Sequence, residues 1–512
     1  MRWRPLLGVC ARRRRRWISS EAAQFLRRCR QAQSAVAPIV GPDDGSAEPN
    51  VKEVFVNNDT GLTYINVYGF DYDYTLANYN SNLESHIYSL AAESLVDKMG
   101  YPPALKSNKF DPDFVIKGLH FDRTTGYLIK LDQFGEFQKD TIMLGREPVP
   151  TEIVAKVYEG RRMPRDYESN RLKLLSDIFS LPEACLLADV VQHFRNMNAE
   201  FHPLYIYQDV RQVLERLHAN GAIHSMIMGQ PSTYLSPSTA TKKYLQTLRA
   251  AGKKVSCASR PHTTLFKRNA QTFLLSNSPF PFIDAGMRFI YSDDWRSLFD
   301  VIIVSAGKPA WFHRDSRFRR VEASGKQSLS RVDRLVPNEI YTQGSLTEFT
   351  RLTGWPGDSV LYFGDQIYSD LVEPQRLGAW KTAAVIKELE KEIKITHGHE
   401  YRRNLHRLLY LENLIADGQT YGGDEIKAAV AKLKQERDAT RKLLKLCINK
   451  HFGSTFRTYN SQTRFFYNIA RYADIYTSRV SNLMSYPLDA TFYSRRSFLP
   501  HERPAYLAQR ES

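Results

Sequence analysis

Five short, mostly apolar runs stand out along the chain. They cover residues 65–70, 273–275, 301–304, 360–363 and 382–386. A short run without polar alternation is typical of a strand that is buried on both faces of a sheet. Helical patterns occupy much of the sequence between the runs, and strands that alternate with helices form parallel sheets. The pattern therefore predicts an α/β fold whose parallel sheet is covered on both faces.

The spacing of the runs predicts how the chain is organised. Roughly 200 residues separate the first run from the second, far more than one parallel crossover needs, so we expect an extra module there. Residues 41–50 have the composition of a linker, and the sequence after residue 386 carries i, i+4 charge pairs typical of helices. We therefore expect a leader and linker at 1–50, a sheet-containing core at 51–80 and 272–386, an inserted cap module at 81–271 and a helical C-terminal extension at 387–512.

One connection is longer than the pattern around it predicts. Residues 255–272 join a helical pattern at 238–250 to the apolar run at 273–275. Connections between a helix and a strand usually have only a few residues. This stretch is either a surface loop or an error in the predicted coding sequence, and both interpretations stay open.

The composition favours a folded protein without membrane spans, disulfides or a zinc site. Hydrophobic residues make up 42% of the 512 residues and charged residues 25%, which is typical of a folded chain with more than one domain. No segment approaches the ~18 uncharged apolar residues that a membrane span requires, so we expect none. The five cysteines are odd in number and never form Cys-x-x-Cys, so we expect neither a disulfide framework nor a zinc site.

The net charge of +16 is concentrated at the N-terminus. Residues 1–42 hold ten arginines and a single acidic residue, Glu21, and so carry nine of the sixteen positive charges. An arginine-rich, acid-poor leader is typical of mitochondrial import. A nuclear-localisation run at 12–16, a disordered basic arm and a cytoplasmic protein are the alternatives. Aromatic and arginine residues interleave at 457–496, but no nucleic-acid motif accompanies them, so we do not expect a nucleic-acid partner.

Two aspartates one residue apart follow the first apolar run. Asp71 and Asp73 share a side on an extended strand, so their carboxylates can converge. Acidic groups at the end of a buried strand are costly unless a cation lies beside them. A Mg²⁺ site with one carboxylate free to attack phosphorus accounts for both residues. The alternative is a chance Asp-x-Asp in a solvated loop or at the start of a helix.

Polar residues also follow the next three runs, where parallel sheets bind ligands. Phosphoryl transfer to an aspartate needs a nucleophile, a metal, an acid, phosphate donors and a compensating cation. Asp71 is the candidate nucleophile and a metal ligand, and Asp73 is the candidate acid, base and a further metal ligand. Ser276 and Asn277 are candidates to bind phosphate oxygens, and Lys308 is the candidate cation. Asp365 is a candidate metal ligand, and Asp370 is a candidate to orient Lys308 or metal-bound water. Taken singly, a serine at a strand end usually caps a helix and a lysine is usually solvated.

These residues resemble the motifs of haloacid-dehalogenase-like phosphohydrolases, in particular the cytosolic purine 5′-nucleotidase family with its 5′-nucleotidase domain-containing members. The matching stretches are 70–76, 276–280, 300–304 with 308–309, 360–365 and 452–458. The resemblance extends from about residue 54 to about residue 503. It implies a Rossmann-like core, a cap inserted after the first strand, dependence on Mg²⁺ and a phosphomonoester substrate.

The resemblance also points to a base-binding helix at 208–218. An arginine and an aspartate of that family contact the purine. Arg211 matches the arginine, Glu215 replaces the aspartate, and His224 stands at a downstream lysine position. An exposed i, i+4 ion pair between Arg211 and Glu215 is the alternative to base contact.

The sequence thus leads to two functional hypotheses. The first is a Mg²⁺-dependent phosphomonoester hydrolase that acts on nucleoside 5′-monophosphates through an aspartyl-phosphate. The second is a catalytically weak scaffold that keeps the phosphatase fold. The helices after residue 386 either pack on the core or pair with a second copy of the chain, so a homo-oligomer stays open.

Overall fold

The computed structural model describes residues 21–31, 49–138, 140–160, 162–163, 170–176, 180–251, 270–322 and 325–496. The chain divides into two compact units. The larger unit comprises Val51–Glu390 and Thr455–Ser512, and the smaller one comprises Met1–Asn50 and Lys391–Ser454. The long connection predicted at 255–272 falls almost entirely outside the described residues, because 252–269 are not among them.

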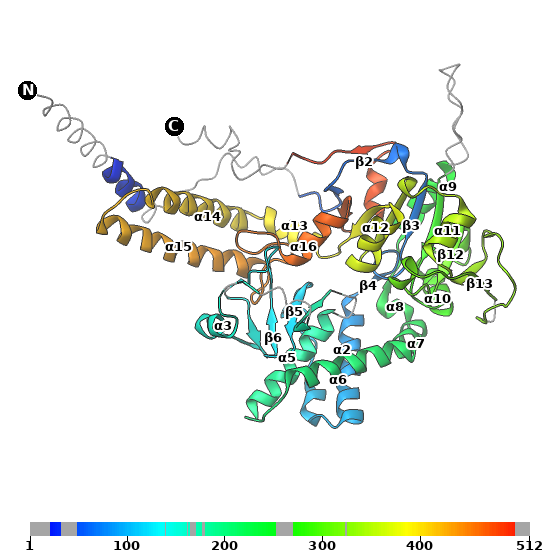
Figure 1. Ribbon diagram of the computed structural model, residues 1–512, viewed down its shortest axis with the longest axis horizontal. Helices are drawn as coiled ribbons and strands as arrows, with labels where there is room; N and C mark the ends of the chain where they lie inside the picture. The colour runs from blue at the N-terminus through cyan, green and yellow to red at the C-terminus, as the bar shows by residue number, and fades with distance from the viewer. Residues whose placement is uncertain are drawn as a thin grey trace, which may run out of the picture. The chain divides into compact units, whose positions relative to one another are not determined.

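A nine-stranded sheet forms the centre of the larger unit (Figure 1). Its order is β1-β17-β16-β15-β3-β11-β12-β14-β13. The seven strands from β17 to β14 are parallel, and β1 and β13 are antiparallel edges. The bounds are β1 (Phe55–Val56), β3 (Val67–Phe70), β11 (Gln271–Leu275), β12 (Val301–Val304), β13 (Phe318–Val321), β14 (Ile340–Gln343), β15 (Val360–Gly364), β16 (Lys381–Val385) and β17 (Ile475–Thr477). The predicted α/β class with a parallel sheet is confirmed.

Each of the five apolar runs contains or overlaps a strand of this sheet, namely β3, β11, β12, β15 and β16. The sequence pattern did not predict β14 and β17. β17 lies in the segment expected to be helical, and it pairs with β16 and β1. Its middle residue, Tyr476, is partly exposed, so the strand lacks the continuous apolar run of a fully buried one. Helices α10 (Phe280–Ile290), α11 (Leu346–Thr353) and α12 (Glu373–Gly378) come after β11, β14 and β15.

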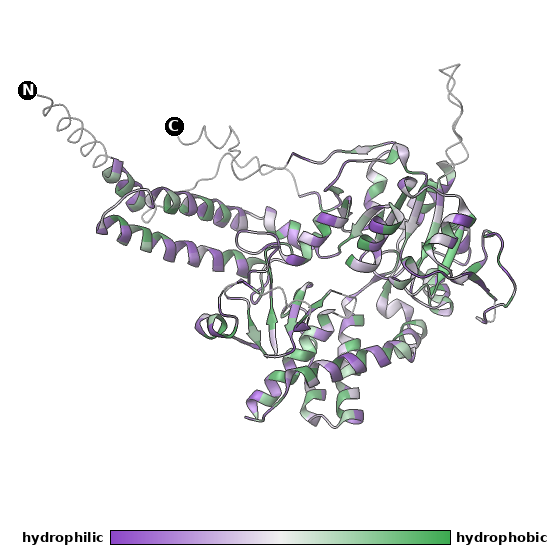
Figure 2. Cartoon of the chain, in the orientation of Figure 1, coloured by the Kyte–Doolittle hydropathy of each residue, from purple (hydrophilic) through white to green (hydrophobic). Residues whose placement is uncertain are grey.

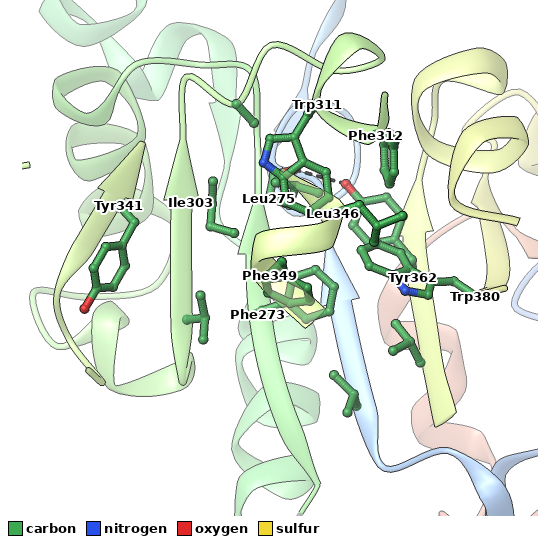
Figure 3. Packing of buried hydrophobic residues seen from close by; sticks show 14 of the residues in the cluster. Phe273, Leu275, Ile303, Trp311, Phe312, Tyr341, Leu346, Phe349, Tyr362 and Trp380 are labelled. Atoms are coloured by element: carbon green, nitrogen blue, oxygen red, sulfur yellow. Dashed lines mark hydrogen bonds between the residues drawn. The ribbon is translucent and has the colours of Figure 1, made fainter. Parts of the chain in front are cut away.

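An aromatic core supports the sheet beside the predicted site (Figure 3). Phe273 on β11 packs against Phe349, Tyr362 and Trp380, with ring centroids 5.0 to 5.9 Å apart. Gly69 on the neighbouring strand makes room for it, since a Cβ there would lie 2.1 Å from the Phe273 ring. Burying each such ring contributes roughly 1.5–3 kcal/mol. The strands that carry the site are therefore held on a densely packed base.

The inserted region between β3 and β11 forms a mixed module of helices and a small sheet. Its helices are α2 (Ser81–Met99), α3 (Thr151–Val157), α5 (Ser180–Asn196), α6 (Pro203–Ala219), α7 (Ala222–Gly229), α8 (Pro231–Tyr234) and α9 (Thr239–Ala251). The antiparallel sheet has the order β8-β7-β6-β5-β9, with β5 (Leu119–Asp122), β6 (Tyr127–Ile129), β7 (Met143–Leu144), β8 (Glu147–Pro148) and β9 (Leu172–Leu175). Asn80 caps α2 by accepting from the Asn82 N–H, and Gly100 ends it in a left-handed conformation.

Short elements complete the larger unit. β4 (Asn78–Tyr79) pairs with β10 (Leu235–Ser236), and β2 (Thr60–Gly61) pairs with β18 (Thr491–Phe492). The last α-helix among the described residues of this unit is α16 (Arg464–Tyr472). Short helical turns lie at Leu62–Tyr64, Pro103–Ser107, Trp295–Leu298, Ala310–Phe312, Gly357–Ser359, Ile367–Val372 and Val480–Ser485. None of the described helices is long and apolar enough to cross a membrane.

His120 on β5 makes the stability of the larger unit sensitive to acid. Burial, and to a lesser extent the charge of Arg464, lowers the pKa of His120 to about 3. The unfolded chain takes up this proton near pH 6.5. The contribution of neutral His120 to stability is therefore present above about pH 6.5 and lost as the pH falls toward 3. We expect the free energy of unfolding to fall by roughly 2–3 kcal/mol between pH 7.5 and 4.5 from this group alone.

The substitution His120→Gln removes the titrating ring and keeps a polar side chain of similar length. Urea denaturation at several pH values should give a shallower loss of stability toward acid for the variant than for the unchanged protein. Identical pH dependence of the two proteins would contradict this assignment.

The smaller unit is built on a helical hairpin of α14 (His399–Gly418) and α15 (Asp424–Ile448); α13 (Leu389–His397) precedes it in sequence. Figure 2 shows that hydrophilic and hydrophobic residues alternate along both helices of the hairpin. Residues 21–31 form a helix whose Phe25 and Cys29 are buried with Leu411, Leu414 and other apolar residues of the hairpin. The described part of the predicted leader is thus a packed helix. Residues 1–20 and 32–48 lie outside the described residues, and mitochondrial import stays a prediction.

Candidate active site

The predicted site residues follow four strands that are neighbours in the central sheet. The order β15-β3-β11-β12 brings the carboxyl ends of these strands to one edge. Asp365 follows β15, Asp71 follows β3, Ser276 follows β11, and Lys308 lies in the loop after β12. Residues that are far apart in the sequence therefore meet where parallel sheets bind their ligands.

Lys308 lies at the centre of the site and is almost fully buried. Its Nζ is 3.1 Å from Asp71 Oδ1 and 2.7 Å from Asp370 Oδ1, and it donates to the Tyr362 hydroxyl at 2.9 Å. Burial opposes the charged form, but Asp370 and Asp71 raise the pKa of Lys308 well above its ordinary value. Lys308 is therefore a fixed positive charge between two carboxylates.

The loop that carries Lys308 is held by its neighbours on both sides. The Lys308 backbone N–H donates to Asn277 Oδ1 at 2.6 Å, and Asn277 Nδ2 donates to the Lys308 carbonyl at 3.0 Å. Gly307 adopts φ = 74°, a conformation that favours glycine. The Trp311 indole N–H donates to the Gln343 carbonyl at 3.0 Å. These contacts fix the position from which the lysine side chain enters the site.

Three carboxylates form a cluster at this edge of the central sheet. One oxygen each of Asp71, Asp365 and Asp370 lies within 4.8 Å of the other two, and all three residues are buried. Burial raises the pKa of Asp365 to about 7 and that of Asp71 well above its ordinary value, although Lys308 lowers the latter. Asp365 Oδ1 has no hydrogen-bond partner among the described residues. A buried, unsatisfied carboxylate oxygen within an all-oxygen donor set fits a divalent metal ion.

Asp370 enters this cluster because of the local backbone after β15. Residues Ile367–Val372 form a short π-helical turn, and the Gln366 N–H donates to Asp370 Oδ2 at 3.2 Å. A Cβ on Gly364 would lie 2.3 Å from the Asp370 side chain, so glycine is needed where the two segments meet. Asp370 contacts Lys308 and also belongs to the carboxylate cluster; its predicted role in orienting Lys308 or metal-bound water stays a prediction.

Asp73, predicted as a metal ligand with Asp71 and Asp365, is not part of the cluster that Asp71, Asp365 and Asp370 form. Its Oδ1 accepts from the Tyr79 hydroxyl at 2.6 Å, and its Oδ2 accepts from the Ser278 hydroxyl at 2.6 Å. β3 ends at Phe70, so the alternation of a strand does not extend to Asp73, and Tyr74 has φ = 52°. Its carboxylate is thus oriented by two hydroxyl groups and still lines the same cavity as Asp71.

Ser276 and Asn277, predicted to hold phosphate oxygens, take different positions. Ser276 is fully buried, and its hydroxyl oxygen accepts from the Ser278 backbone N–H at 3.2 Å. Asn277 and Ser278 line the cavity, whereas Ser276 does not. Ser276 therefore stabilises the turn after β11. Asn277 lines the cavity and also forms hydrogen bonds with the backbone of Lys308.

A cavity of about 390 Å³ opens on these residues. Asp71, Asp73, Lys308 and Asp365 lie in its wall together with Asn277, Ser278, Pro309, Gln366, Tyr368, Ser369, Arg211 and His218. Volumes of about 300–1,000 Å³ are usual for sites of small molecules. The catalytic candidates and the predicted base-binding helix therefore face one common space.

Arg211 and Glu215 form the ion pair that the sequence left as an alternative to base contact. Arg211 Nε lies 2.9 Å from Glu215 Oε1, and Arg211 Nη1 lies 3.4 Å from Glu183 Oε2. Arg211 lines the cavity, whereas Glu215 does not, and the Glu215 side chain is 64% exposed. Contact of either residue with a base stays a prediction.

Sequence reasoning did not find two further contacts of the site. Tyr362 accepts a hydrogen bond from Lys308 and donates to the Leu275 carbonyl at 3.0 Å, but its own strand pattern marks it only as core. Lys117, from the inserted module, places Nζ 3.5 Å from Asp365 Oδ2. No local motif marks Lys117, because its partner is 248 positions away in the sequence.

The comparisons with known proteins agree with this architecture. The model of the 5′ nucleotidase family matches residues 54–504. A 5′-nucleotidase domain-containing protein of Dictyostelium discoideum is 40% identical over 459 residues, which cover 88% of this chain and 75% of the relative. The 5′-nucleotidase domain-containing protein 2 of Homo sapiens is 37% identical over 468 residues, which cover 90% and 87%. The rat protein of the same name is also 37% identical, with 90% and 82% covered. Because the match includes the carboxylate cluster, its central lysine and the inserted module, we conclude that the chain belongs to the 5′ nucleotidase family.

Proposed function

We propose that this protein is a Mg²⁺-dependent hydrolase of nucleoside 5′-monophosphates that works through an aspartyl-phosphate on Asp71. The observation that carries the proposal is the placement of Lys308 between Asp71 and Asp370, beside Asp365, in the wall of a cavity of about 390 Å³. A nucleophilic carboxylate in a buried site needs a fixed positive charge to stay ionised. The family name and the names of the relatives support a nucleotide as the substrate.

Asp71 is the nucleophile in this proposal. Its Oδ1 accepts from the Tyr72 N–H at 2.7 Å and lies 3.1 Å from Lys308, so we assign attack on phosphorus to Oδ2. The Oδ2–phosphorus bond forms as the bond from phosphorus to the ester oxygen breaks. Lys308 offsets negative charge that the phosphate brings beside the carboxylates.

Asp73 is the acid and base of the proposal. It gives a proton to the departing ester oxygen, and it later takes a proton from the water that breaks the Asp71–phosphorus bond. The hydroxyl groups of Tyr79 and Ser278 hold its carboxylate toward the cavity that Asp71 also lines. Placement by two neutral donors suits a group that must change its protonation state twice in one cycle.

Asp71, Asp365 and Asp370 are the side chains that we expect to hold Mg²⁺. When bound, the ion would supply charge compensation for the phosphoryl oxygens and fix their orientation. Asp365 carries the unsatisfied oxygen, and Lys117 Nζ lies 3.5 Å from its other oxygen. Asn277 and Ser278 supply polar contacts in the wall of the cavity for the phosphate.

The substitution Asp73→Asn tests the role of the acid. We expect turnover of nucleoside 5′-monophosphates to fall by roughly 10²- to 10⁴-fold, the usual contribution of general acid–base catalysis. With p-nitrophenyl phosphate, the rate of phosphoryl transfer to Asp71 should fall less, because the nitrophenolate leaving group needs no proton. Stopped-flow release of nitrophenol should then show a burst of about one equivalent, because hydrolysis of the aspartyl-phosphate becomes slow.

The proposed activity itself is tested by phosphate release from a panel of nucleoside 5′-monophosphates with and without Mg²⁺. We expect release that requires Mg²⁺ and is abolished by EDTA. Tight Mg²⁺ binding without phosphate release from any member of the panel would instead favour the scaffold hypothesis.

A further inference from the structure

A second, larger cavity is lined in part by β13, an edge strand of the central sheet, whereas the catalytic candidates follow strands in the middle of that sheet. Its volume is about 620 Å³, and it shares no lining residue with the catalytic cavity. Four arginines line it, namely Arg317, Arg319, Arg331 and Arg351. Glu348 is the one acidic residue among its described lining residues, so the wall carries a formal charge of three positive units.

A buried carboxylate positions two of these arginines. Glu348 is only 3% exposed. Arg351 donates to both of its oxygens, from Nε at 2.7 Å and from Nη2 at 2.8 Å, and Arg317 Nη1 donates to Oε2 at 2.5 Å. The two arginine side chains remain 52% and 72% exposed. One carboxylate thus fixes two guanidinium groups, and their other N–H groups remain for a ligand.

The remaining two arginines complete a basic wall. Arg319 is exposed and has no acidic partner among the described residues. Arg331 pairs with Asp333 at 2.6 Å, but both side chains are largely exposed, at 86% and 66%, so water competes with this pair. Ser316, Ser328 and Ser330 add hydroxyl groups to the lining. Fixed guanidinium groups combined with hydroxyl donors are typical of sites that bind phosphate groups.

We propose that this cavity binds a small ligand that carries more than one phosphate group. Four guanidinium groups against Glu348 and the exposed Asp333 leave two positive charges, which a single monovalent anion would not neutralise. The proposal does not depend on the proposed phosphatase activity, because the two cavities have no lining residue in common.

The test measures the affinity of the full chain for inorganic tripolyphosphate by titration calorimetry, without Mg²⁺ and at constant ionic strength. The variant carries Arg319→Gln and Arg331→Gln, since neither residue supports Glu348. The matched control carries Arg288→Gln and Arg403→Gln, two arginines that do not line this cavity and whose loss changes the net charge equally. Citrate serves as a multivalent anion without phosphate.

We expect the cavity variant to bind tripolyphosphate about tenfold more weakly for each arginine removed, whereas the control variant should change by less than about threefold. Citrate should bind the unchanged protein more weakly than tripolyphosphate does. If both variants bind tripolyphosphate equally weakly, the binding comes from general electrostatic attraction and not from the cavity, and the proposal is overturned. Unchanged affinity of the cavity variant, or tighter binding of citrate, would overturn it as well.

Discussion

Replacement of Asp71 by asparagine is expected to abolish phosphate release from nucleoside 5′-monophosphates. The amide cannot form the acyl-phosphate bond, and it also removes one carboxylate from the group of three that includes Asp365 and Asp370. Loss of a covalent nucleophile costs at least about 10⁴-fold in turnover in comparable enzymes. Asparagine has nearly the shape of aspartate, and the hydrogen bond from the Tyr72 N–H to Oδ1 can be kept. The fold should therefore survive while the chemistry is lost.

The measurement is steady-state phosphate release at saturating Mg²⁺, followed by mass spectrometry of the protein after acid quench. A phosphorylated peptide that contains residue 71 should be present in the unchanged protein and absent from the variant. Asp293→Asn is a suitable control, since Asp293 is a highly exposed aspartate whose ion pair with Arg288 lies at the surface. Turnover of Asp71→Asn within tenfold of the unchanged protein would rule out the proposed nucleophile.

Replacement of Lys308 by methionine is expected to cost both activity and stability. The lysine lies between two buried carboxylates, and its removal leaves Asp71 and Asp370 close together with no cation between them. Loss of one partner from a buried ion pair destabilises a protein by about 3–5 kcal/mol. Phosphate release should also fall strongly, because the positive charge that compensates the incoming phosphate is gone. The effect on stability should be largest in EDTA, when no metal ion can compensate the carboxylates.

Urea denaturation followed by tryptophan fluorescence measures this loss. All four tryptophans among the described residues lie in the larger unit, and Trp311 and Trp380 belong to the core beside the site. Lys109→Met, at an exposed position of the same unit, is the control and should change stability little. The double variant Lys308→Met and Asp370→Asn should regain much of the stability but not the activity. A stable Lys308→Met single variant would contradict the charge argument.

The sequence predicted the centre of the fold because that part depends on short-range patterns. Five apolar runs correspond to five of the strands of the central sheet, and the predicted parallel arrangement is confirmed. Strands β14 and β17 were not predicted. β17 has only three residues with one partly exposed, and its place in the sheet depends on pairing of Ile475 with Ala383 of β16 and with the far more distant Val56 of β1. Strand pairing of this kind is decided by tertiary packing more than by local preference.

The residues of the site were predicted more completely than their arrangement. Asp71, Lys308 and Asp365 meet as expected, because each follows a strand of the same sheet edge. The inclusion of Asp370 in the carboxylate cluster, and the position of Asp73 outside it, depend on where β3 ends and on the turn after Gly364. Side-chain directions after a strand end are set by such local backbone conformations, which alternation along the strand does not predict.

The sequence by itself therefore determined the class of fold, the order of the candidate site residues along the chain and the family that their motifs resemble. The fold class follows from apolar periodicity, the candidate residues from residue types at strand ends, and the family from the resemblance of those motifs. The tertiary structure alone decided that Tyr362 and Lys117 contact the site, that Asn277 holds the backbone of Lys308, and that Glu348 fixes two arginines beside a second cavity. The physical reason is that charge compensation and hydrogen bonding act over a few ångströms in space, and only the folded chain sets which groups come that close.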